Sequence, residues 1–139
     1  AVRASSPAND RCANAIDVSA GGLFIGTLVY AAADGTTVCA DPVPTADVWY
    51  RFTAGTCPLW VNVNTCGTHD ASGTNTVLSV FSACGGTELA CNDDGFGALC
   101  GSLDLGLLND AYLFTNVNPG QTVLIRVSHR PGSAPGTNP

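Results

Sequence analysis

The chain is poor in the residues that favour helices. It contains no lysine and no methionine, and Glu88 is its only glutamate. Charged residues make up 12% of its 139 residues, about half the share usual in soluble domains. Because lysine, glutamate and methionine are strong helix formers, their scarcity excludes a mostly helical protein. Threonine, valine, asparagine, glycine and proline are plentiful instead, and these residues are typical of strands and turns.

Basic charge is equally scarce. The five basic residues are all arginines, and the net charge is −6 with a pI of about 4.3. Because the sequence provides no basic surface, we expect neither nucleic acids nor anionic membranes as partners. No apolar run approaches the roughly 20 residues that a membrane helix needs, so we expect no membrane insertion. The opening residues AVRASSPAND contain no signal peptide and are typical of a mature or trimmed protein.

The seven cysteines lack the spacing of a metal site. No C-x-x-C motif occurs, and His69 and His129 lie far from any pair of cysteines. Disulfide bonds in an oxidising compartment are the better interpretation, and they predict a secreted protein. Because seven is odd, at least one thiol is free or pairs outside the chain.

Three parts are expected along the chain: an N-terminal arm (1–11), a folded body (12–130) and a Pro/Gly-rich tail or linker (131–139). Alternation of apolar and polar residues in the body indicates half-buried strands. Residues 12–18 fit either a helical turn or an extended lead-in. The predicted fold is all-β, an antiparallel, jelly-roll-like β-sandwich with disulfides. Its strands, about eight, are expected at 23–30, 47–54, 59–65, 76–82, 88–91, 102–107, 111–117 and 121–128.

The strand prediction constrains the disulfides. A strand at 59–65 spans over ~20 Å, whereas a disulfide needs Cα atoms within about 7 Å, so a Cys57–Cys66 bond is excluded. If 59–65, 76–82 and 88–91 form a meander, the remaining cysteines sort to its two ends. The expected pairs are then Cys57–Cys84, one bond among Cys66, Cys91 and Cys100, and Cys12–Cys39, which flank the first predicted strand.

A calcium site is predicted in the loop that follows the strand at 88–91. Asn92, Asp93 and Asp94 supply hard oxygen ligands that suit Ca²⁺, and two adjacent carboxylates repel each other without a cation. The meander brings the 67–75 loop to the same end, so Asp70 or Asn75 is expected to join them. The alternative is a plain turn, because Asp, Asn and Gly are also turn residues.

Two tryptophans suggest a binding platform. Trp49 and Trp60 lie opposite the clearest apolar stripes of their predicted strands, beside Arg51, Asn62 and Asn64. Sugar rings stack on indoles and form hydrogen bonds with amides, so these five residues are candidates for carbohydrate binding. The alternative is that the N-terminal segment or a long loop covers the tryptophans as part of the core.

No catalytic group is expected. His69 and Asp70 form a tempting pair, but the sequence contains no G-x-S-x-G or H-E-x-x-H motif and no cysteine with an evident base. A glycosidase-like carboxylate pair is poorly supported, because Glu88 is the only glutamate and the aspartates cluster in loops. We therefore predict that the protein is not an enzyme.

An ordered set of motifs resembles the bacterial pre-peptidase C-terminal (PPC) domain family, in its Cys-rich secreted form. The motifs are NDRCANAI at 9–16, DVWYRFTA at 47–54, TCG at 65–67, NTVLSVF at 75–81, CGGTELACNDD at 84–94 and VLIRV at 123–127. The resemblance implies a jelly-roll-like sandwich without activity of its own, appended to secreted hydrolases or surface proteins. Some relatives bind calcium or polymers such as collagen, chitin or polysaccharide. Asn75 stands where family members tend to have Asp, which weakens the calcium expectation there.

Two functions remain in view. The first is a non-catalytic extracellular module for adhesion or binding to a carbohydrate or protein polymer, secreted by a bacterium or held at its surface. The second is a structural subunit that assembles with copies of itself into a filament or surface layer, with its N-terminal arm contacting a neighbour. A disulfide-bonded sandwich of low charge with a Thr/Asn-rich surface suits either role.

Overall fold

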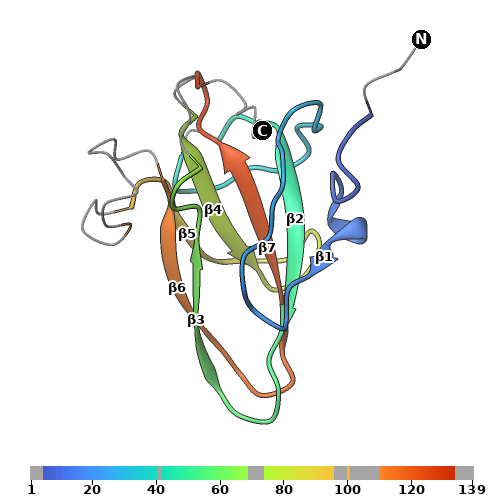
Figure 1. The fold of residues 1–139 in the computed structure, drawn as a ribbon, viewed down its shortest axis with the longest axis vertical. Coiled ribbons are helices and arrows are strands. Elements are labelled where there is room, and N and C mark those ends of the chain that lie inside the picture. The colour runs from blue at the N-terminus through green and yellow to red at the C-terminus, as the bar shows by residue number, and fades with distance from the viewer. Residues whose placement is uncertain (1–4, 41, 69–73, 96–99, 101–109, 134–139) are drawn as a thin grey trace.

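The computed structural model describes residues 5–40, 42–68, 74–95, 100 and 110–133. One 3₁₀ turn, η1 (Cys12–Asn14), is the helical element of the described residues, and seven strands make up the rest of the regular structure (Figure 1). No helix in this part of the chain is long and apolar enough to cross a membrane. The strands are β1 (Ile16–Asp17), β2 (Asp47–Thr53), β3 (Leu59–Asn64), β4 (Thr76–Phe81), β5 (Glu88–Asn92), β6 (Tyr112–Val117) and β7 (Thr122–His129).

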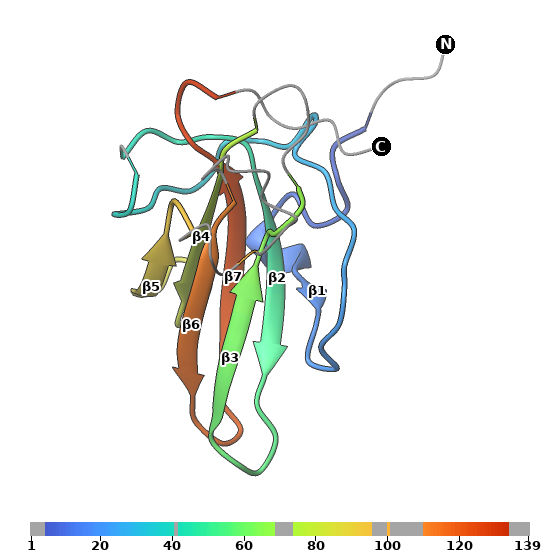
Figure 2. The ribbon, with the colours of Figure 1, turned by 60° about the vertical axis from the view of Figure 1, so that its left-hand side comes forward.

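The strands form two packed sheets, which confirms the predicted β-sandwich. The larger sheet has the order β1-β2-β7-β4-β5, and the smaller pairs β3 with β6. All pairs are antiparallel except the short parallel pair of β1 and β2. Figure 2 shows β3 and β6 as a second layer over β2, β7 and β4.

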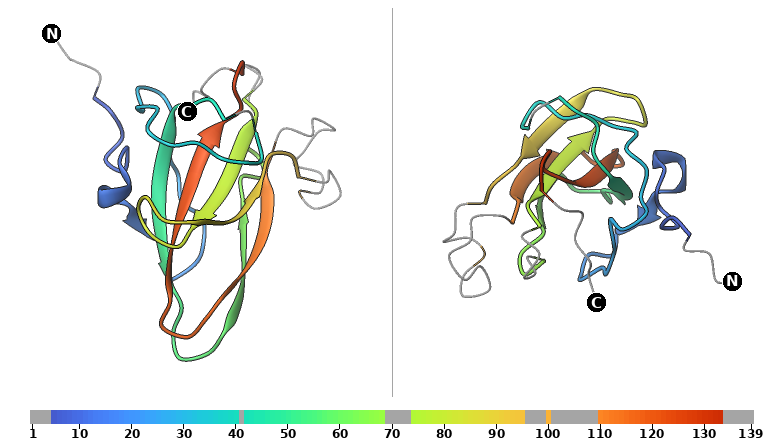
Figure 3. Two further views of the ribbon diagram at one scale, coloured as in Figure 1. Left: turned by 180° about the vertical axis from the view of Figure 1, so that it is seen from behind. Right: turned by 90° about the horizontal axis from the view of Figure 1, so that it is seen from above.

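Period-two alternation in the sequence produces the core between the two sheets. On β2, Val48, Tyr50 and Phe52 point toward the β3–β6 layer and are buried. Val123 and Ile125 of β7 join them, as the alternation of the last predicted strand indicates. The larger sheet is also covered on its other face. The left view of Figure 3, taken from behind, shows residues 82–87 and 33–40 crossing over this other face.

Residues 23–30, predicted as the first strand, do not form one. Gly21 and Gly22 precede the segment with φ of 69° and 112°, and Tyr30 ends it with φ of 65°. Leu23 and Ile25, which the alternation would place together on one face, are 90% and 79% exposed. A cleft separates the segment from β3, and the segment pairs with none of the described strands. Residues 12–18 form η1 and β1, and the predicted strand at 102–107 lies outside the described residues.

The cysteine pairing differs from the meander prediction. The bonds are Cys12–Cys84, Cys39–Cys91 and Cys66–Cys100, and Cys57 is free and exposed. The bond expected among Cys66, Cys91 and Cys100 is confirmed, as is the absence of a Cys57–Cys66 bond.

The predictions of Cys57–Cys84 and Cys12–Cys39 were wrong for topological reasons. β3 belongs to the smaller sheet and does not pair with β4, so the start of β3 does not lie beside the end of β4. The turn after β4 instead reaches η1 across the back of the larger sheet (Figure 3). Cys12 and Cys39 were paired in the prediction because they flank 23–30, which is not a strand.

Candidate functional site

The outer face of the smaller sheet carries aromatic and amide side chains. Its β3 residues alternate with Val61 and Val63, which pack against the core. On this face Trp60 is 74% exposed and Phe114 is 52% exposed. We call it the β3–β6 face, formed by Trp60, Asn62 and Asn64 of β3 and Tyr112, Phe114 and Asn116 of β6.

Strand register places these side chains in facing pairs. Trp60 lies opposite Asn116, Asn62 opposite Phe114, and Asn64 opposite Tyr112. Each aromatic ring therefore has an amide directly opposite it on the neighbouring strand. Trp60 and Phe114 are diagonal neighbours, which places them roughly 7–8 Å apart.

Hydrogen bonds fix the amides of the β3–β6 face. The Cys66 N–H donates to Asn64 Oδ1 over 3.3 Å, and Asn64 Nδ2 donates to Asn62 Oδ1 over 2.8 Å. Asn62 Nδ2 in turn donates to the Tyr112 hydroxyl. The Tyr112 ring packs edge-on against Phe114, with centroids 5.3 Å apart. The polar groups are thus held in place before any ligand arrives, which lowers the entropy cost of binding.

The β3–β6 face has no charge of its own. Neither LWVNVN of β3 nor YLFTNV of β6 contains an acidic or basic residue. Such a surface suits a neutral ligand that combines apolar faces with hydroxyl groups.

The structure separates the two predicted tryptophans. Trp49 is only 5% exposed and lies on the outer face of the larger sheet, against Phe81 with centroids 5.6 Å apart. Its Nε1 donates to Asp47 over 3.1 Å and to Asp34 over 3.4 Å. Arg51 also lies on the larger sheet, where it pairs with Asp17 at 3.1 Å. Of the predicted platform, Trp60, Asn62 and Asn64 come together, whereas Trp49 and Arg51 do not join them.

Sequence reasoning missed the half of the face that β6 contributes. Tyr112, Phe114 and Asn116 alternate with Leu113 and Thr115 in a segment that was predicted as a strand. The alternation was therefore a usable signal, but the pairing of that strand with β3 was not apparent.

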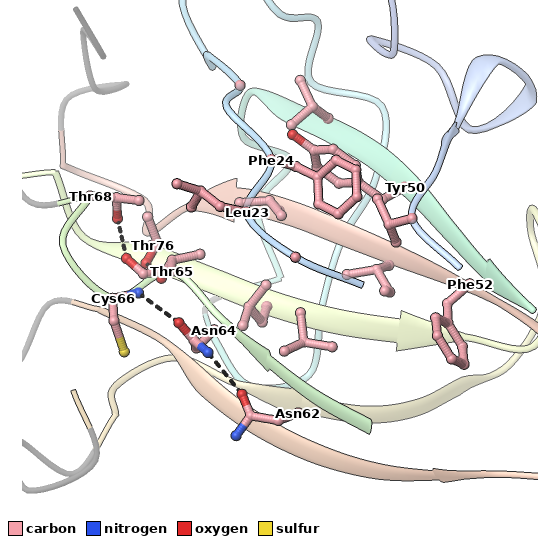
Figure 4. Close-up of a pocket in the computed structure, with 18 of the residues that line it drawn as sticks. Leu23, Phe24, Tyr50, Phe52, Asn62, Asn64, Thr65, Cys66, Thr68 and Thr76 are labelled. Carbon is pink, nitrogen blue, oxygen red and sulfur yellow. Dashed lines mark hydrogen bonds between the residues drawn. The ribbon is translucent and has the colours of Figure 1, made fainter. Parts of the chain in front are cut away.

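A cleft of about 320 Å³ opens beside β3 (Figure 4). Residues 21–28 form one wall, β3 forms the other, and the core face of the larger sheet forms the floor. Leu23, Phe24 and Phe52 make much of the lining apolar, while Thr65 and Thr76, whose hydroxyls are 2.5 Å apart, lie at a polar end. No charged residue lines the cleft in the described part of the chain.

The predicted calcium loop lies next to Arg130. Its Nη1 is 3.2 Å from Asp93 Oδ2 and 3.7 Å from Asp94 Oδ2, and Asn75 Nδ2 donates to Asp94 Oδ1 over 3.3 Å. Asp93 Oδ1 and Asn75 Oδ1 are buried without a hydrogen-bond partner among the described residues. Burial and the neighbouring Asp94 carboxylate raise the pKa of Asp93, against the attraction of Arg130.

The other predicted ligands are less available. The Oδ1 of Asn92 accepts the backbone N–H of Tyr112 over 3.0 Å, and Asp70 lies outside the described residues, as does His69. Among the residues that the structure describes, no three His, Cys, Asp or Glu side chains are grouped to hold a metal ion. A cation in this loop would therefore also need the amide oxygen of Asn75.

Comparison with known families identifies one match. Residues 8–138 match the model of a T9SS-associated family described as galactose binding domain-like. No curated protein and no solved structure matches the chain. The match supports the β-sandwich class that the motif resemblance implied, but it does not support the PPC family specifically. Association with T9SS and three disulfides together indicate a secreted, extracellular protein.

Proposed function

Because the chain belongs to the T9SS-associated family of galactose-binding-domain-like modules, we propose that it is a non-catalytic carbohydrate-binding module. Its binding surface is the β3–β6 face, and its role is adhesion, holding a larger secreted protein or a bacterial surface on a polymer. The motif resemblance to PPC domains is compatible with this role, since those modules are also non-catalytic appendages.

One observation carries the proposal. Exposed aromatic rings lie next to amides that are already fixed by hydrogen bonds: Trp60 and Phe114 beside Asn62 and Asn64. A group of exposed aromatic side chains on a protein surface is typical of a binding site, and Trp is among the residues that contribute most to binding. The apolar face of a sugar ring covers an indole, and its hydroxyls bond to amides.

The shape and charge of the face define the ligand class. The rings lie on the exposed outer surface of a two-stranded sheet, so they suit an extended polysaccharide better than a short sugar enclosed on all sides. The absence of charge on β3 and β6 favours neutral polymers over acidic ones. Galactose-containing neutral polysaccharides are the first ligands to test.

The test measures binding to immobilised neutral polysaccharides. We expect Trp60→Ala and Phe114→Ala each to weaken binding by at least about tenfold, the effect of losing 1.4 kcal/mol. Leu89→Ala is the matched control, because Leu89 is a 46% exposed apolar residue on the other sheet. Equal binding by Trp60→Ala and the unmodified protein would rule out this face.

Calcium is proposed as a structural ion at Asp93, Asp94 and Asn75. Two buried oxygens, Asp93 Oδ1 and Asn75 Oδ1, have no hydrogen-bond partner among the described residues, and they support the site, as does the repulsion between the Asp93 and Asp94 carboxylates. The unmodified protein is expected to melt at a higher temperature in calcium than in chelator. Asp93→Asn combined with Asp94→Asn should remove that difference, and Asp17→Asn should retain it. Identical melting curves of the unmodified protein in calcium and in chelator would refute the site.

A further inference from the structure

Among the described residues, the layer that contains β3 has an edge without a strand partner. β3 pairs with β6, and no other strand of the described part of the chain pairs with it. The Thr65 N–H donates to Ala111 O over 3.0 Å, which continues the β3–β6 ladder by one step. Since hydrogen-bonded positions alternate along an antiparallel strand, Val61 and Val63 bond to β6. The backbone N–H and C=O groups of Trp60, Asn62 and Asn64 therefore point to the open edge.

A second segment without strand pairing faces this edge across the cleft. Residues 22–25 make no backbone–backbone hydrogen bond in the described part of the chain, and the side chains of Leu23 and Ile25 are largely exposed. The gap between this segment and β3 is the 320 Å³ cleft, whose floor is the apolar core face of the larger sheet. Figure 4 shows Leu23 and Phe24 on the far side of the gap from Asn62 and Asn64.

The open edge lacks the usual protection against strand addition. Natural edge strands are blunted by lysine, proline, bulges or inward charges. β3 contains no charged residue and no proline, and its pairing with β6 has no register shift. An exposed edge of this kind accepts an extended segment through main-chain hydrogen bonds.

We propose that the cleft accepts an extended strand from a second copy of this chain, supplied by residues 1–6. The inserted strand pairs with β3 at Trp60, Asn62 and Asn64 and covers the apolar floor of the cleft. This site is distinct from the β3–β6 face, which uses side chains on the outer surface of the same strand.

Three observations identify residues 1–6 as the donor. The family match begins at residue 8, so the segment lies outside the matched module. Asn9 anchors the chain, because its backbone carbonyl accepts the Trp49 N–H over 2.9 Å, and Ser5 and Ser6 before it are exposed and lead away from the sandwich (Figures 1 and 3). The sequence AVRASS has no acidic residue and places the small side chains Val2, Ala4 and Ser6 at alternate positions, which suit a cleft without charged lining residues.

The proposed contact is head-to-tail. Six residues of strand span ~20 Å, which matches the six residues of β3. Each copy donates one segment and accepts another at a different place, so the contact repeats into rings or open filaments instead of closing as a twofold dimer.

The test uses the full chain and a matched pair of variants in analytical ultracentrifugation. Asn62→Pro and Asn62→Ala both remove the amide side chain, but only proline also removes the backbone N–H of residue 62. Because this N–H points to the open edge, its loss removes no hydrogen bond between β3 and β6. The unmodified protein and Asn62→Ala are expected to sediment as assemblies heavier than the 14.1 kDa monomer. Asn62→Pro and a chain lacking residues 1–6 should each stay monomeric.

Mixing the two monomeric variants completes the test. Asn62→Pro retains the donor segment and the truncated chain retains the cleft, so together they should form a one-to-one complex. Circular dichroism checks folding, and Val63→Trp, which fills the cleft, replaces Asn62→Pro if that variant does not fold. The proposal is overturned if the unmodified protein is monomeric at every concentration, if the truncated chain still assembles, or if Asn62→Pro and Asn62→Ala behave alike. Glycan binding by the truncated chain, measured separately, reports on the β3–β6 face alone.

Discussion

Trp49 and Trp60 have the same place in the alternation patterns of their strands, but their environments in the structure are opposite. Each lies on a strand, opposite the side chains that point to the core. Trp49 is 5% exposed, whereas Trp60 is 74% exposed. The alternation pattern predicts the direction in which each ring points, but it does not predict what covers the ring.

The difference arises from a covering segment. Residues 33–36 lie beside Trp49, whose Nε1 donates to Asp34, and Arg126 holds them there because its Nη2 donates to the Gly35 carbonyl over 2.6 Å. A Cβ at position 35 would lie 2.7 Å from Arg126 Nε, so glycine allows the close approach. Arg126 is itself paired with Asp47 at 2.7 Å. Nothing comparable covers Trp60 among the described residues. One tryptophan therefore stabilises the fold, and the other remains available to a ligand.

The largest effect on the free energy of unfolding is expected from replacing Arg126. Arg126→Ala leaves the Asp47 carboxylate buried without its partner and releases the segment over Trp49. Loss of one partner of a buried ion pair costs about 3–5 kcal/mol of the free energy of unfolding, measured by urea denaturation. Arg51→Ala is the matched control, because the side chains of Arg51 and Asp17 are half exposed and an ion pair in water contributes little to stability. Equal losses of unfolding free energy in the two variants would show that the buried Arg126–Asp47 pair stabilises the fold no more than the exposed Arg51–Asp17 pair.

The next effect concerns the Cys39–Cys91 bond, which ties the covering segment to β5. Replacing both cysteines with serine should lower the free energy of unfolding by about 2–4 kcal/mol. It should also shift tryptophan fluorescence to longer wavelength, since water gains access to Trp49. Cys57→Ser is the control and should change neither quantity, because Cys57 is free and exposed. An unchanged emission spectrum in the double variant would show that the bond does not hold the cover.

The pH dependence of stability follows from the same buried pair. Burial raises the pKa of Asp47 to about 6, since lost hydration outweighs the attraction of Arg126. The folded state therefore binds a proton more readily than the unfolded chain, and stability increases as the pH falls from about 6 to about 4, on the order of 1–2 kcal/mol.

Below that range the trend reverses. Hydrogen bonds from Ser19 and Arg51 lower the pKa of Asp17 to about 2, so its contribution is lost as the pH falls from about 4 toward 2. Urea denaturation at several pH values should show a maximum near pH 4, and Asp47→Asn should flatten the rise between pH 6 and 4. A steady fall in stability from pH 6 downward would contradict the raised pKa of Asp47.

Local periodicity was enough to predict much of the fold. The alternation in 47–54 and 121–128 predicted β2, β7 and the core side of each, and the positions of Trp60, Asn62 and Asn64 followed from the same rule. The partner of β3 did not follow, because its pairing with β6 joins residues about 50 positions apart and is set by the packing of the two sheets. Tyr112 and Phe114 were missed for that reason.

Long-range topology also explains the failed disulfide predictions. Cys12–Cys84 spans 72 positions and depends on the turn after β4 crossing the back of the sheet. The segment that covers Trp49 has no periodic pattern at all. Its position depends on Glu88 and Cys91 of β5 and on Arg126 of β7.

The smallest effect on stability is expected at Trp60. Its ring is 74% exposed, so Trp60→Ala should change the free energy of unfolding by less than about 0.5 kcal/mol. Trp49→Ala is the matched substitution in the covered environment, and it should cost about 3–5 kcal/mol. Polysaccharide binding should show the opposite order, because Trp60→Ala removes a ring from the β3–β6 face and Trp49→Ala does not touch that face. Urea denaturation and binding measured on the same two variants check both halves. If Trp60→Ala destabilised the fold as much as Trp49→Ala, the exposed ring would be part of the core packing, and its loss of binding would no longer identify a ligand site.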